Sequence, residues 1–168
     1  MIQMKDEIVE EKIGAIIVAT GYDLFDTREI TQLGYKKYDN VYTGLEFERI
    51  NNAAGPTSGK IQLKDGSIPK SVAILHCIGS RDKNYHEYCS RVCCMYALKY
   101  AHLIKEKIDA DVYNCYIDMR CFGKGYEEFY HRLTEEGVDF IRGKAVNILN
   151  YNEAKILYPD MLEALGMQ

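Results

Sequence analysis

The sequence has no tryptophan, only three prolines among 168 residues, and no apolar run that approaches the length of a membrane span. Crossing a bilayer takes about 20 consecutive apolar residues, so we expect no membrane association. The first residues lack the regions of a secretory signal, so we expect the cytoplasm as the location. Basic residues do not dominate either: Lys plus Arg is 21 against 25 for Asp plus Glu. A nucleic-acid partner is therefore not expected.

The cysteines of the sequence are unusually clustered. Six are present, and four of them fall within eighteen residues: Cys77, Cys89, Cys93 and Cys94. In a chain without a secretion signal, such clustering favours metal or redox chemistry over a disulfide scaffold. Different roles are expected for the other two cysteines. Cys115 falls inside a predicted strand and is interpreted as core, and Cys121 follows that strand and is the weaker candidate ligand.

From residue 69 onward the hydrophobic pattern predicts an alternation of strands and helices. Strands are expected at 71–76, 112–119 and 138–141, and helices at 89–107 and 126–136. This order predicts an α/β fold, a Rossmann-like βαβαβ unit with a parallel sheet and right-handed crossovers. Ligands of such sheets bind beyond the carboxyl ends of the strands. The first strand ends at Cys77, so the fold and the cysteines indicate the same place.

The first part of the chain has weaker patterns. A charged stretch at 5–11 predicts an edge strand, and the apolar run at 13–21 predicts a strand buried on both faces. The pattern Thr43-x-x-Glu46 is a capping box and predicts a helix over 44–52. An Asp-Gly pair within 61–68 predicts a small hairpin.

The turn after the first regular strand lacks the G-x-G-x-x-G motif of dinucleotide-binding folds. Gly79 is the only glycine between residues 77 and 82. Asp118 follows the next predicted strand, where an acid can hold a ribose, but one acid is weak support. We interpret the fold as a dinucleotide fold whose ligand site is occupied by thiolates.

The cysteine spacing is C-x11-C-x3-C-C. On one helix Cys89 and Cys93 would share a face, while Cys94 would be turned by about 100°. Cys77 would approach from the strand end. Four thiolates can hold a [4Fe–4S] cluster, and the first turn of a helix stabilises its negative charge. Two nearby cations would favour that charge further, Arg81 and Arg91.

Other interpretations of the same cysteines stay open. Buried cysteines often serve only as small apolar residues. A structural zinc site takes the same ligands, usually from C-x2–4-C knuckles. Cys93 and Cys94 can form a strained, readily reduced disulfide. His86 can replace one thiolate, whereas His76 is expected to point to the opposite face of its strand and to serve the core.

Several motifs together resemble one protein family. They span residues 77–82, 88–97, 101–106, 118–120, 122–130 and 140–143, and upstream 14–22 and 45–50. These stretches resemble the A subunit of heterodisulfide reductase, an iron–sulfur flavoprotein, over about residues 5–148. The double-cysteine motif is the most specific of them, whereas the strand ending in Ala19-Thr20-Gly21 is shared by many flavoproteins.

The resemblance implies a thioredoxin-reductase-like FAD module that takes part in electron bifurcation in anaerobes and in methanogenesis. It implies a [4Fe–4S] cluster on the four clustered cysteines and flavin contacts near Thr20 and Gly21. It divides the chain into a segment of the FAD-type domain (1–40), a Rossmann-like domain that carries the cysteines (41–150) and a weakly specified tail (151–168), expected to be helical.

The family's ferredoxin motifs and first FAD-binding half have no counterpart in this sequence. We therefore expect an internal piece of the family's chain that does not enclose FAD or act as an enzyme alone. The expected function is electron transfer through a [4Fe–4S] cluster, between flavin and partner subunits of a redox complex. The alternative is a non-catalytic Rossmann-like interaction domain whose cysteines hold structural zinc or no metal.

Overall fold

A three-stranded parallel sheet organises the part of the chain that the computed structural model describes, residues 6–149. The strands are β1 (Ser71–Leu75), β2 (Asp111–Tyr116) and β3 (Val138–Arg142), in the spatial order β1-β2-β3. The predicted α/β fold with a parallel sheet is thereby confirmed. The helical tail expected from residue 150 lies outside the described residues.

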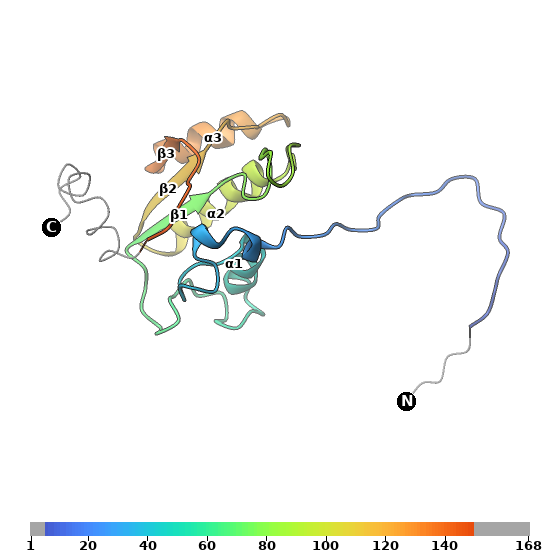
Figure 1. The fold of residues 1–168 in the computed structure, drawn as a ribbon, viewed down its shortest axis with the longest axis horizontal. Coiled ribbons are helices and arrows are strands. Elements are labelled where there is room, and N and C mark those ends of the chain that lie inside the picture. Colours follow the sequence, from blue (N-terminus) through green and yellow to red (C-terminus); the bar gives the residue numbers. More distant parts are fainter. Residues whose placement is uncertain (1–5, 150–168) are drawn as a thin grey trace.

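Two crossover helices cover one face of this sheet (Figure 1). Helix α2 (Cys93–Lys107) joins β1 to β2, and α3 (Tyr126–Glu135) joins β2 to β3. The helices contact each other as well as the strands, as two right-handed crossovers in succession require. The core lies between these two layers. Its side chains include Leu98, Ala101, Ile104, Val112, Leu133 and Val138.

Helix α1 (Gly44–Asn51) forms where the capping box predicted it. The Thr43 hydroxyl accepts a hydrogen bond from the Glu46 N–H, and the Glu46 carboxylate accepts one from the Thr43 N–H. The helix packs on α2, with the Phe47 and Tyr100 rings 5.2 Å apart. Two short 3-10 turns precede it, η1 (Thr27–Glu29) and η2 (Thr31–Leu33).

The strands predicted at 5–11 and 13–21 are wrong: the structure shows no strand or helix over residues 6–26. This segment runs outward from the body of the molecule (blue in Figure 1), and Ile17 is 91% exposed. A strand needs a neighbour to pair its N–H and C=O groups and to cover its apolar side chains. Within residues 6–149 no strand lies beside this segment to do so.

Three further boundaries differ from the sequence prediction. The hairpin expected at 61–68 is a single turn, in which the Leu63 N–H donates to the Ser67 carbonyl at 2.7 Å. Strand β2 ends at Tyr116. Helix α2 begins at Cys93 instead of residue 89, because Arg91 adopts a left-handed backbone with φ of 65°.

None of the helices in the described region is long and apolar enough to cross a membrane.

Candidate metal centre

Three of the four clustered cysteines meet at the carboxyl edge of the sheet. Cys77 follows β1, and Cys93 and Cys94 begin α2, so the β1–α2 loop brings their side chains together. All three are buried, with 5, 7 and 4% of their surface exposed. The Cys94 thiol donates to the Asp118 carbonyl at 3.8 Å, and Cys93 lies close enough to Cys77 and Cys94 to shift the pKa of both. We call these three residues the thiol triad.

The three thiols of the triad differ in the direction of their pKa shifts. The neighbouring Cys77 and Cys94 side chains hold the pKa of Cys93 below its ordinary value. Interaction with the Cys93 side chain, together with burial, raises the pKa values of Cys77 and Cys94. Val92, the residue at the N-terminus of α2, makes no side-chain capping bond. The helix dipole at that end therefore acts directly on the triad and favours its negative charge.

Cys89 lies apart from the triad, in the loop before α2. Its half-buried sulfur accepts a hydrogen bond of 3.4 Å from the Arg91 N–H and acts electrostatically on Cys77. The expectation that Cys89 and Cys93 share a helix face is wrong, because α2 begins at Cys93. Cys89 instead lines an open cleft of about 700 Å³ together with Cys121.

The β1–α2 loop is fixed by its own backbone hydrogen bonds. The Arg81 N–H donates to the Tyr88 carbonyl and the Asp82 N–H to the His86 carbonyl, both at 3.0 Å. Three of the residues near the sulfurs have left-handed backbones: φ is 59° at Cys77, 54° at Arg81 and 65° at Arg91. Such conformations cost free energy in residues with side chains and gather at functional sites.

A chain of charges crosses the ends of all three strands. The Arg81 Nη2 donates to Asp118 Oδ2 at 2.8 Å, and the Arg142 Nη2 donates to Asp118 Oδ1 at 3.2 Å. The bond from Arg81, supported by Arg142, holds the pKa of Asp118 below its usual value. The sequence suggested a ribose contact for Asp118, but its carboxylate is engaged by two arginines. Sequence reasoning missed Arg142, whose signal was a cation at the end of a predicted strand.

His76 and Asn114 form a buried polar pair that joins the end of β1 to β2. The His76 Nε2 lies 2.9 Å from Asn114 Oδ1, and both residues are almost fully buried. The core role expected for His76 is confirmed, while Asn114 was not recognised from the sequence. Its signal was an amide in the middle of an apolar strand. His86 points its Nδ1 at the Gly79 carbonyl, 3.1 Å away.

The remaining candidates do not join the triad. Cys115 is a half-buried residue of β2, and burial raises its pKa. Cys121 packs against the core, and its pKa is also raised by burial. Thr20 and Gly21 lie on the exposed outward segment. The described residues around them form no enclosure for a ligand the size of FAD.

A fit to an iron–sulfur cluster is judged from the side chains at this edge. Within residues 6–149, no group of three or more His, Cys, Asp or Glu side chains is arranged to hold a single metal ion. Arg81 nevertheless has a buried Nη1 that finds no acceptor in the described part of the chain. A buried N–H donor beside converging thiols suits a group that carries negatively charged sulfur. The donor set therefore fits a thiolate-ligated cluster.

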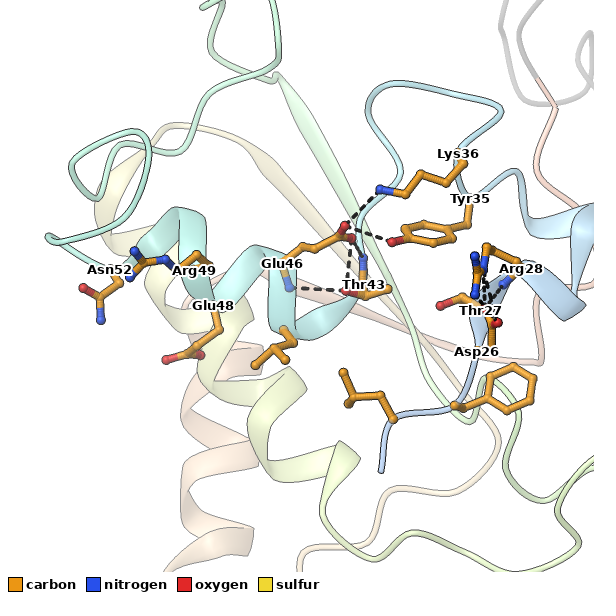
Figure 2. A pocket seen from close by; sticks show the side chains of 13 residues that line it. Asp26, Thr27, Arg28, Tyr35, Lys36, Thr43, Glu46, Glu48, Arg49 and Asn52 are labelled. Carbon is orange, nitrogen blue, oxygen red and sulfur yellow. Dashed lines mark hydrogen bonds and ion pairs between the residues drawn. The ribbon is translucent and has the colours of Figure 1, made fainter. Parts of the chain in front are cut away.

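A second cleft, of about 910 Å³, lies between the outward segment and α1 (Figure 2). Two ion pairs line it: Arg28 with Asp26 at 2.7 Å, and Lys36 with Glu46 at 3.3 Å. The Tyr35 hydroxyl also donates to Glu46, at 2.9 Å. No cysteine or histidine is among the residues that line this cleft.

The chain is similar in sequence to subunits of known reductases. No family model matches the chain. It is 54% identical over 147 residues to the A subunit of the H(2):CoB-CoM heterodisulfide,ferredoxin reductase of Methanothermobacter thermautotrophicus. It is 51% identical over 158 residues to an iron-sulfur A subunit of the CoB--CoM heterodisulfide reductase of Methanopyrus kandleri. The matches cover 85 and 90% of this chain, which spans only 22 and 24% of the length of these relatives.

Proposed function

We propose, from the premise that this chain is homologous to part of the A subunit of heterodisulfide reductase, that it is an electron-transfer module of an oxidoreductase of that kind. Its sulfurs would hold a [4Fe–4S] cluster that relays single electrons between a flavin and partner subunits. The convergence of the thiol triad at the carboxyl edge of the sheet supports this proposal most strongly. One relative is itself named an iron–sulfur subunit.

The residues that would hold the cluster are Cys77, Cys93 and Cys94, with Cys89 as the fourth ligand from the adjacent loop. A bound cluster would supply one-electron transfer that needs no proton transfer at these sulfurs. The chain's own contribution is to bury the triad, to direct the N-terminus of α2 at it, and to place a cation beside it. Burial and charge are the levers by which a protein sets a reduction potential.

Flavin and partner subunits enter the proposal through the resemblance alone. Thr20 and Gly21 are the residues proposed to contact FAD, but around them the described residues leave the ligand open to solvent. We derive no step through flavin from this chain. The partners are proposed to be the other subunits or domains of the complex to which such a reductase component belongs.

Iron and sulfide analysis of the full chain, reconstituted without oxygen, tests the cluster. We expect iron and sulfide in equal amounts and a brown protein with broad visible absorption. Cys94→Ala removes a buried triad sulfur, so it should lower bound iron several-fold and leave a folded chain by circular dichroism. Cys115→Ala is the matched control, because Cys115 lies in β2 and outside the triad.

Two results would contradict the proposal. Unchanged iron in Cys94→Ala would show that the ligand set is wrong. A colourless chain with one zinc ion after the same reconstitution would favour the structural alternative, in which the fold serves interaction and carries no electrons.

A further inference from the structure

Arg81 is a cation of the β1–α2 loop that lies close to Cys77 and Cys89. Its side chain is 21% exposed, and its charge acts on the sulfurs of Cys77 and Cys89. Its Nη2 is used by Asp118, whereas its Nη1 is buried and has no acceptor among residues 6–149. A buried donor is rarely left without a partner in a native protein. The Nη1–H is therefore available to an acceptor that a group bound at the neighbouring sulfurs would supply.

Asp118 and Arg142 determine which nitrogen of Arg81 stays free. Arg142 engages Asp118 Oδ1 and also reaches the Ile117 carbonyl, at 3.3 Å from its Nε. Arg81 binds the other oxygen, Asp118 Oδ2, through its Nη2. The guanidinium is planar and rigid, so fixing one nitrogen also fixes the direction of the other. This arrangement orients Arg81 without consuming its second donor.

We propose that Arg81 donates its Nη1–H to a sulfur of the cluster and raises the reduction potential, with Asp118 as the positioning residue. This inference rests on the proposed function. Gain of one electron makes the site more negative by one unit and breaks no bond. A fixed cation with a directed hydrogen bond therefore stabilises the reduced state more than the oxidised state.

The test is an anaerobic, optically monitored redox titration of the reconstituted full chain with dithionite. Arg81→Gln removes the charge and should favour the oxidised state about tenfold, which lowers the midpoint potential by about 59 mV for a one-electron couple. Arg81→Lys keeps the charge but replaces the rigid planar fork by an ammonium whose donors have no fixed direction, so its shift should be smaller. Asp118→Asn removes a negative charge, which alone would raise the potential, so a lowered potential in this variant would show that Arg81 has lost its position. Arg132→Gln removes an exposed cation of α3 and is the control for remote charge.

Iron content measured in the same samples separates the two proposals. Full loading in Arg81→Gln with a lowered potential supports the role of Arg81. Full loading with the potential of Arg132→Gln overturns it and leaves the proposed function standing. If Arg81→Gln binds no iron, Arg81→Lys decides, because it retains a cation at this position: an unchanged potential there overturns the inference. A wild-type chain that binds no iron contradicts the proposed function itself.

Discussion

At the residue scale, the site depends on backbone conformations that most side chains avoid. Cys77 and Arg81 are both left-handed, and Gly79 between them has φ of 68°. A β-carbon at Gly79 would lie 2.3 Å from Cγ of Phe25, whose ring packs on Tyr85. The loop can therefore turn this tightly only with glycine at this position. The same loop carries Cys77 and Arg81, whose side chains interact electrostatically.

Gly79→Ala should destabilise the chain through both strain and contact. A left-handed backbone costs a residue with a side chain about 1–2 kcal/mol, and displacement of Phe25 adds to this. We expect a loss of about 2–3 kcal/mol in the free energy of unfolding, measured by urea denaturation. Gly66→Ala is the control: φ is 86°, but no atom lies within 4 Å of its β-carbon. Equal losses in the two variants would show that contact with Phe25 has no effect.

At the scale of elements, short sequence patterns determine where the helices form, and contacts between distant residues determine how they pack. The capping box begins α1, and α1 packs on α2 through Phe47 and Tyr100. Lys99 of α2 also donates to Glu48 of α1 at 2.6 Å. Helix α1 thus contacts α2 at Lys99 and Tyr100, away from the first turn of α2, where the cysteines lie. One helix serves both the core and the site.

Glu46→Gln tests the cap of α1 through its pH dependence. Burial raises the pKa of Glu46, but hydrogen bonds from Thr43, Tyr35 and Lys36 outweigh this and hold it below its ordinary value of 4.5. A depressed pKa stabilises the fold above the unfolded value and loses this effect as the pH falls through the folded one. We expect a loss of about 0.5–1 kcal/mol at pH 7.

The measurement is urea unfolding of both proteins at pH 7 and near pH 3. The difference between wild type and Glu46→Gln should shrink at the lower pH, because the fraction of protonated wild-type carboxylate rises as the pH falls toward its lowered pKa. Glu87→Gln, at an exposed position in the β1–α2 loop, should match wild type at both pH values. A difference that grows at low pH would reverse the sign that the structure implies.

At the scale of the whole molecule, the described chain has a folded body and an outward segment. The body is built on the sheet, α2 and α3, and Leu98 at its centre is fully buried. The outward segment carries the apolar run that sequence reasoning assigned to a buried strand, and Ile17 within it is 91% exposed. The two parts should therefore differ sharply in how mutations affect stability.

Leu98→Ala and Ile17→Ser make this difference measurable. Leu98→Ala should lower the free energy of unfolding by about 2–5 kcal/mol, because it leaves a cavity in the core. Ile17→Ser should change it by less than about 0.5 kcal/mol, as an exposed substitution does. Thermal and urea unfolding check both variants. A large loss in Ile17→Ser would mean that the apolar run packs against the body after all.

The sequence alone determined the parallel α/β fold, the helices α1, α2 and α3, and the grouping of cysteines after the first regular strand. These follow from hydrophobic periodicity, capping residues and spacing, which are properties of short stretches. It failed where an outcome depends on residues far apart in the chain. The run at 13–21 has strand composition, but only a neighbouring strand can make it one.

Only the tertiary structure decided how the site is built. It placed Cys89 in a loop instead of on α2, and it joined Arg81 to Asp118 across 37 positions of the chain. The left-handed backbones of the β1–α2 loop set where these side chains point. Side-chain direction at a loop depends on closure of the whole fold, and no spacing rule contains that information.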